Sequence, residues 1–219
     1  HTPSIVKKLD NPIEVAKYAG RAGMKADAFR SLAQAVYARR HEVPVARARL
    51  AEAARKAAIP VLSHDDATLE DRAHFRAHGA SICEFPMAEA VAADARAAGE
   101  AVVMGAPNVV RGGSHLGWAS AAPLAEAGLV TILASDYFWP SMMAAAFVME
   151  RRGVMDLAQA WALISANPAR ACGLHDRGRL EQGMRGDAVV VDRQSQAPIA
   201  VFAAGDLAWL SPAGALRIS

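Results

Sequence analysis

The chain has 219 residues, of which 53% are hydrophobic and 21% are charged, and its formal net charge is +2. This length suits one large domain or a domain with a small appendage, and the composition is typical of a globular α/β protein with a sizeable core. The small net charge argues against nucleic-acid binding, no apolar run is long enough for a membrane span, and two cysteines form no disulfide framework, so we expect a cytoplasmic protein.

The first sixty residues are predicted to be helical. Asn11 is a suitable N-cap, because Pro12 follows at the first helical position and Glu14 lies three residues after the cap, and we expect this helix to run to about Ala19. The spacing of apolar residues predicts two further helices, over residues 25–40 and 44–58.

From residue 59 onward, short apolar runs alternate with helix-like segments. The apolar runs predict strands over residues 59–64, 80–85, 101–105 and 129–134. The segments between and after them predict helices over residues 68–78, 86–99, up to about 127, 140–152 and 155–166. Because strands and helices alternate, we expect the four strands to pair in parallel.

The last fifty residues have a different pattern. A short helix is expected over residues 167–172, followed by short strands at 188–192, 199–203 and 208–210. These strands are not separated by helices, so we expect a small β appendage over residues 176–219, with residues 1–175 belonging to the main domain.

Polar side chains follow each apolar run at the point where the strand ends. The first strand ends in His64, Asp65 and Asp66, the second ends in Glu84, and Asn108 and Asp136 follow the third and fourth. In a (β/α) barrel the C-terminal ends of parallel strands carry the active site. We therefore expect these residues to gather at one edge of the sheet.

The first two strand ends allow several interpretations. A neutral imidazole such as that of His64 suits zinc, iron or manganese, but a histidine can also cap a strand end through local hydrogen bonds. We expect Asp65 to orient His64, whereas Asp66 could either do the same or cap the next helix. Glu84 is a metal ligand, a second acid near the metal, or a partner in a surface salt bridge.

The third and fourth strand ends favour an anionic ligand and a functional acid. Asp136 follows a buried strand, where an unpaired carboxylate would be costly, so we favour a role in the site over an N-cap for the helix after Pro140. The loop of residues 111–115 combines Arg111 and His115 with two glycines and a serine, which suits a polyphosphate. An ordinary flexible loop is the alternative.

Several motifs together resemble a known family. Residues 167–174 (Asn-Pro-Ala-Arg-Ala-Cys-Gly-Leu), followed by Gly183, Gly186 and the strand 188–192, resemble the C-terminal signature of the amidohydrolase superfamily. Residues 1–3, 63–66, 111–115 and 134–137 resemble the branch of that superfamily that serves phosphonate metabolism. The resemblance implies a metal-dependent (β/α)8 TIM-barrel hydrolase fold, of which this chain holds the later strands, with a small C-terminal β-sandwich.

The resemblance also implies an activity and the residues that carry it. The activity is removal of pyrophosphate from α-D-ribose 1-methylphosphonate 5-triphosphate in the carbon–phosphorus lyase pathway, with one or two divalent ions of zinc, manganese or iron. The implied metal ligands are His1, His64, Glu84 and Asp136, and Asp136 also takes the proton of the attacking water, with His115 as a second catalytic group. The substrate-binding residues are then Asn108, Arg111, Gly112, Gly113, Ser114 and His115.

Other expectations concern the extent of the chain and its partners. Family members carry further strands, with a histidine-containing metal motif, before the equivalent of His1, so we expect this chain to be part of a longer one. The expected partner is a small phosphorylated molecule rather than nucleic acid or a membrane, and a homodimer is considered. Two other functions stay open: hydrolysis of a C–N bond in a cyclic amide or an amine, or a non-catalytic role if the chain is complete.

Overall fold

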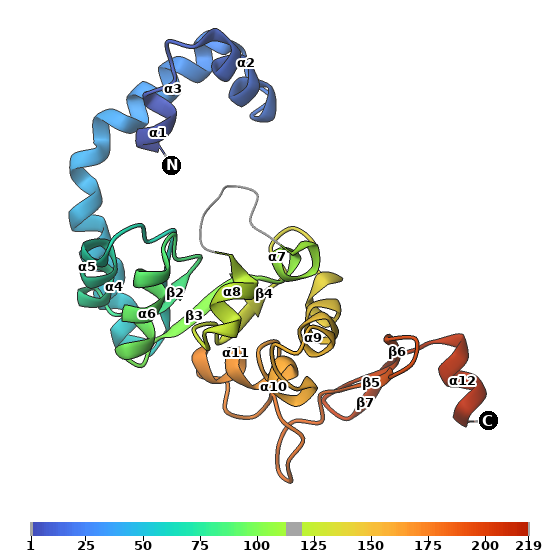
Figure 1. Ribbon diagram of the computed structural model, residues 1–219. Helices are drawn as coiled ribbons and strands as arrows, with labels where there is room; N and C mark the ends of the chain where they lie inside the picture. The colour runs from blue at the N-terminus through green and yellow to red at the C-terminus, as the bar shows by residue number, and fades with distance from the viewer. Residues whose placement is uncertain (1, 113–119, 219) are drawn as a thin grey trace. The chain divides into compact units, whose positions relative to one another are not determined.

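The computed structural model describes residues 2–112 and 120–218, and the chain forms two compact units, residues 1–53 and residues 54–219. The first unit is helical, as predicted (Figure 1). Its helices are α1 (Thr2–Val6), α2 (Pro12–Arg21), α3 (Ala26–Ala38), the 3-10 turn η1 (Arg39–Glu42) and most of α4 (Val43–Lys56). The predicted N-cap is confirmed, because the Asn11 side chain accepts hydrogen bonds from the backbone N–H groups of Ile13 and Glu14.

The second unit is built on a four-stranded parallel sheet (Figure 1). Its strands, in the order β1-β2-β3-β4, are Val61–His64, Ala80–Glu84, Ala101–Gly105 and Ile132–Ala134. Its helices are α5 (Leu69–Ala77), α6 (Glu89–Ala97), α7 (Ala106–Arg111), α8 (Ala121–Glu126), α9 (Ser141–Arg151), α10 (Leu157–Ala162) and α11 (Ala166–Ala171). The predicted alternation and the parallel pairing are confirmed.

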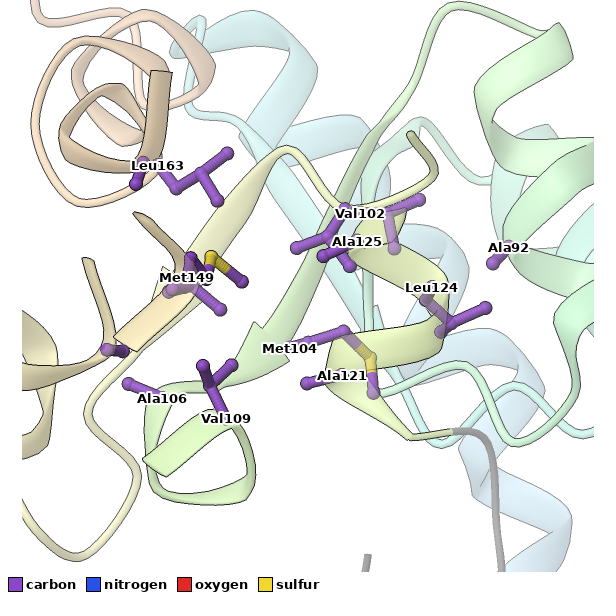
Figure 2. Close-up of a cluster of buried hydrophobic side chains, with 14 of the residues drawn as sticks. Ala92, Val102, Met104, Ala106, Val109, Ala121, Leu124, Ala125, Met149 and Leu163 are labelled. Atoms are coloured by element: carbon purple, nitrogen blue, oxygen red, sulfur yellow. The ribbon is translucent and has the colours of Figure 1, made fainter. Parts of the chain in front are cut away.

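The strand register separates the side chains onto two faces of this sheet. Ser63 pairs with Cys83, and Cys83 pairs with Val102, so these side chains share one face. Cys83 and Val102 belong to the main hydrophobic core, which also includes buried residues of α6 to α10 (Figure 2). His64, Glu84 and Val103 occupy the paired positions of the other face.

The C-terminal segment contains the three predicted strands but not the predicted sandwich. Strands β5 (Ala188–Asp192), β6 (Ala197–Ala203) and β7 (Asp206–Leu210) form one antiparallel sheet, and helix α12 (Pro212–Ile218) follows it. A β-sandwich requires two packed sheets, whereas the described residues of this segment form one, so they do not bear out the predicted sandwich. The boundary predicted between residues 175 and 176 stays a prediction.

Helix α12 was not predicted, although its start carries a recognisable signal. The Ser211 hydroxyl accepts a hydrogen bond from the Gly214 backbone N–H at 2.9 Å, and Pro212 occupies the first helical position. This is the same combination of cap and proline that identified the start of α2.

Candidate active site at the strand ends

The ends of β1 and β2 bring a histidine and two acids together. His64 and Glu84 are paired in the strand register, and His64 Nε2 lies 3.6 Å from Glu84 Oε2. His64 Nδ1 lies 3.0 Å from Asp65 Oδ1, which is the contact expected of an acid that orients the imidazole. The Asp65 backbone N–H donates to the Glu84 carbonyl at 3.0 Å. The two strand ends are therefore joined through both backbone and side chains.

Three residues just beyond strand ends have a left-handed backbone. The φ angles are +60° at Asp65 after β1, +51° at Phe85 after β2 and +50° at Asp136 after β4. Such conformations in non-glycine residues cost about 1–3 kcal/mol each, and they concentrate at functional sites. Gly105, which ends β3, leaves room for Phe85, because a Cβ at this glycine would lie 3.1 Å from the Phe85 ring.

Asp66 does not take part in this group and does not cap a helix. Its side chain is buried with those of Ser63 and Arg72. The Ser63 hydroxyl donates to Asp66 Oδ2 at 2.7 Å, and Arg72 Nη1 lies 2.9 Å from the same oxygen. The N-cap of α5 is Thr68, whose hydroxyl accepts from the Asp71 N–H at 3.1 Å. The capping interpretation of Asp66 is therefore wrong, and its carboxylate belongs to the face opposite His64.

The neighbouring thiol of Cys83 belongs to the same buried face. Cys83 Sγ lies 3.7 Å from Asp66 Oδ2. Burial raises the pKa of the Cys83 thiol to about 11, so the thiol is protonated at neutral pH. A protonated, buried thiol is a packing group rather than a nucleophile.

The segments after β3 and β4 meet through a contact between Arg111 and Tyr137. Asn108 and Arg111 lie in α7, where Arg111 Nη2 donates to Asn108 Oδ1 at 3.1 Å. The Arg111 guanidinium also lies 5.6 Å from the centre of the Tyr137 ring, and Tyr137 directly follows Asp136. Gly112 is the C-cap of α7, and its φ of +87° is a left-handed conformation that favours glycine.

Two arguments about Asp136 have to be corrected. Asp136 is exposed, so the cost of burying its charge does not explain it. The competing interpretation as a helix cap is wrong too, because the N-cap position of α9 is Pro140, with no side-chain capping bond. The functional role of Asp136 stays a prediction, supported by its place beyond β4 and by its left-handed backbone.

Among the described residues, no group of three or more histidine, cysteine, aspartate or glutamate side chains is arranged to hold a metal ion. His64 and Glu84 supply two donors on adjacent strands, whereas Asp136 follows β4, on the opposite edge of the sheet from β1. Four predicted site residues, His1, Gly113, Ser114 and His115, lie outside the described residues.

Sequence reasoning missed two parts of this region. Tyr137 was not singled out, although it begins a run of three exposed aromatic residues, Tyr137, Phe138 and Trp139, directly after the predicted acid. Arg72 was also missed, because its position in α5 resembles that of any charged residue on a helix.

No helix of the described residues is long and apolar enough to cross a membrane.

Comparisons with known proteins show which family the chain resembles. The model of a family described as "Amidohydrolase family" matches residues 17–206. The α-D-ribose 1-methylphosphonate 5-triphosphate diphosphatase of Escherichia coli (strain K12) is 44% identical over 138 residues, covering 62% of this chain and 36% of that protein. The chain thus spans about a third of the length of this relative.

Solved structures share the fold at low sequence identity. An amidohydrolase from Thermotoga maritima MSB8 is 18% identical with a TM-score of 0.57, covering 95% of this chain and 54% of that one. Ochratoxinase from A. niger is 18% identical with a TM-score of 0.56, covering 76% of this chain and 46% of that one. At these identities the likeness concerns the fold alone.

Proposed function

The chain belongs to the amidohydrolase family, and on this basis we propose that it is the later part of a metal-dependent hydrolase that releases pyrophosphate from a sugar triphosphate. The observation that carries the proposal is the 44% identity, over 138 residues, to the diphosphatase that acts on α-D-ribose 1-methylphosphonate 5-triphosphate. Because the match covers 36% of that relative, the activity and its substrate are proposed for this chain.

We place the four parallel strands as the later strands of a (β/α)8 barrel. In such a barrel the helices cover the outside, and the other face of the sheet points inward. The face of Cys83 and Val102 packs on helices, so the face of His64 and Glu84 is the inward one. The strand ends that carry His64, Glu84 and Asp136 then lie at the rim where barrel enzymes hold their substrates.

The donors at this rim fit a divalent metal. His64, with its Nδ1 held by Asp65, and Glu84 supply the imidazole and carboxylate ligands that zinc, manganese and iron accept, and Asp136 is a further ligand in the proposal. A divalent ion held there supplies Lewis acidity and lowers the pKa of the attacking water. The ligands of one ion include groups beyond the described residues, because three donors do not meet within them.

The remaining roles follow from the chemistry of each side chain. The exposed carboxylate of Asp136 accepts the proton of the attacking water. Arg111 carries a permanent positive charge that holds phosphate oxygens and compensates the charge of the departing pyrophosphate. Asn108, bonded to Arg111, orients this guanidinium.

The proposal is tested by assaying the longest natural form of the protein for pyrophosphate release. We expect release from ribose 1-methylphosphonate 5-triphosphate in the presence of zinc, manganese or iron, and loss of release after chelation. Cyclic amides such as hydantoins are the matched comparison, because they test C–N hydrolysis by the same fold. C–N hydrolysis without pyrophosphate release would overturn the substrate assignment, and no turnover with any metal would favour a non-catalytic role.

A further inference from the structure

A buried hydrogen bond closes the turn at the end of β1. Ser63 and Asp66 are the first and last residues of the turn, and the Ser63 hydroxyl donates to Asp66 Oδ2 at 2.7 Å. His64 and Asp65 lie between them, with Asp65 in the left-handed conformation at a φ of +60°. The two outer side chains are buried, at 4% and 1% exposure, whereas half of the His64 side chain is exposed. The turn therefore buries its two outer residues and leaves its two inner residues, His64 and Asp65, partly exposed.

Arg72 of α5 donates hydrogen bonds to this turn from the buried side. Its side chain is fully buried, and Nη1 donates to Ser63 Oγ at 2.6 Å and to Asp66 Oδ2 at 2.9 Å. Nη2 donates to the Ala80 carbonyl at the start of β2, at 2.7 Å, and Nε lies 3.2 Å from a carboxylate oxygen of Glu100. One guanidinium therefore joins the β1 turn to the beginnings of the next two strands.

The backbone of the turn is hydrogen-bonded to the end of β2 and to the segment that follows it. The Asp66 carbonyl accepts a hydrogen bond from the Met87 N–H at 3.0 Å, and the Asp65 N–H donates to the Glu84 carbonyl at 3.0 Å. His64 consequently has little freedom to move relative to Glu84. These contacts also offset the cost of the left-handed backbone at Asp65.

We propose that Ser63, Asp66 and Arg72 are positioning residues that together hold His64 and Asp65 beside Glu84 at the proposed active site. We call these three residues the β1 clamp. The inference rests on the proposed function for its catalytic consequence, but the positioning itself is a property of the fold. Ligand groups held by a packed and hydrogen-bonded shell lose less freedom when substrate or metal binds.

The test compares clamp variants with a variant at the outer end of the same charge network. Ser63→Ala removes the closing bond, Asp66→Asn removes the charge that pairs with Arg72, and Ser63→Thr keeps the hydroxyl. Arg76→Met is the matched control, because Arg76 pairs with Glu100 and with Asp94 at 2.7 Å but makes none of the contacts that close the turn. All variants are made in the longest natural form of the protein.

The primary measurement is hydrogen exchange at the Asp65 amide, normalised to the amides of β3. We expect exchange to accelerate about fivefold or more in Ser63→Ala and Asp66→Asn, and to stay at the parent rate in Ser63→Thr and Arg76→Met. In the active enzyme, kcat should fall about 10-fold to 100-fold in the first two variants with little change in KM. Should Asp66→Asn fail to fold, Ser63→Ala carries the test, because it leaves the pair of Asp66 and Arg72 in place.

The outcomes separate the clamp from the proposed function. The clamp would be overturned if the exchange rate at Asp65 and kcat changed no more in Ser63→Ala than in Arg76→Met. The buried hydrogen bonds would then stabilise the fold without positioning His64. A parent protein that releases no pyrophosphate would overturn the proposed function, and the exchange rates at Asp65 would still decide whether the clamp exists.

Discussion

The guanidinium of Arg111 lies over the ring of Tyr137, 5.6 Å from its centre. Arg111 ends α7, after the third strand, and Tyr137 follows the fourth strand, so this contact links two successive loops at the proposed site. The same guanidinium also donates a hydrogen bond of 3.1 Å to Asn108 Oδ1. The positive charge is therefore held between Asn108 and Tyr137, the residue that follows Asp136, before any substrate binds.

Removing the charge of Arg111 should weaken substrate binding. Charge-assisted hydrogen bonds contribute about 1.5–3 kcal/mol each, so we expect Arg111→Met to raise KM for the triphosphate by about tenfold or more. Tyr137→Leu removes only the ring, whose interaction with a cation contributes about 0.5–1 kcal/mol at an exposed site, and should raise KM about twofold to fivefold.

Tyr37→Leu is the control for these measurements. Tyr37 lies under the guanidinium of Arg40, at 4.5 Å, in the first unit of the chain, and its loss should leave KM unchanged. An unchanged KM in Arg111→Met would show that this residue does not bind the phosphates.

Asp136 should be required for turnover and dispensable for folding. Asn tolerates the left-handed backbone found here, at a φ of +50°, and the side chain is exposed, so Asp136→Asn should unfold at the parent temperature. Its kcat should fall to the background rate, because the amide cannot accept the proton of water. Asp136→Gly relaxes the backbone and also lacks the carboxylate, and it should be equally inactive. A kcat within about twofold of the parent in either variant would remove Asp136 from the mechanism.

The sequence was sufficient to predict what depends on local pattern. Apolar runs separated by helices predicted the four parallel strands, and the residues at the ends of the runs predicted the neighbourhood of His64 and Glu84. Asn11 and Pro12 predicted the start of α2 for the same reason, since a cap acts within one helical turn.

The predictions that were wrong concern contacts between residues that lie far apart in the chain. They also concern residues of the same type that differ only in burial. Asp65 and Asp66 are chemically identical, yet one contacts His64 and the other is buried against Arg72. The left-handed backbone at Asp65 interrupts the strand alternation, which would otherwise place Asp66 on the His64 face. The exposure of Asp136 also depends on the loop path after β4, which no local pattern specifies. The predicted sandwich was carried over from the family rather than read from the strands of this chain.

Loss of Arg72 should strongly destabilise the second unit. Its removal leaves the carboxylate of Asp66 buried without a cation, and removing one partner of a buried ion pair costs about 3–5 kcal/mol. We expect this decrease in the free energy of unfolding of Arg72→Met, measured with urea. Arg39→Gln, which breaks an exposed pair with Glu42, should leave the urea midpoint unchanged. A loss below about 1 kcal/mol for Arg72→Met would contradict the buried network.

The two cysteines should react at very different rates. Cys172 is exposed, whereas Cys83 is buried and its pKa is raised to about 11, so only about one Cys83 thiol in a thousand is ionised at pH 8. Iodoacetamide should therefore modify Cys172 in the native protein and Cys83 only on unfolding, as mass spectrometry of the labelled peptides would show. Equal rates at the two thiols under native conditions would contradict the burial of Cys83.

The raised pKa of Cys83 also gives stability a pH dependence with a defined sign. Unfolding exposes the thiol and returns its pKa to its ordinary value of about 9, so between about pH 9 and pH 11 the unfolded state releases a proton that the folded state keeps. This contribution lowers the stability of the fold as the pH rises through that range. The parent should accordingly lose more stability between pH 8 and pH 10.5 than Cys83→Ala does. An equal loss in both proteins would contradict the shifted thiol.

Two glycines of the C-terminal segment allow backbone strain to be separated from steric contact. Gly178 and Gly183 both have left-handed backbones, with φ of +89° and +85°. A Cβ at Gly178 would lie 2.8 Å from the Cβ of Ala169 in α11 and 3.0 Å from the Ser165 carbonyl oxygen, whereas a Cβ at Gly183 would meet no atom within 4 Å.

Gly183→Ala should therefore lose about 1 kcal/mol of unfolding free energy from the strained backbone alone. Gly178→Ala should lose this amount and about 1–3 kcal/mol more, because Ala169 and the backbone of Ser165 cannot move away without disturbing the start of α11. Urea unfolding of the two variants measures the difference directly, and the shared strain cancels. Equal losses would mean that residue 178 does not pack against α11.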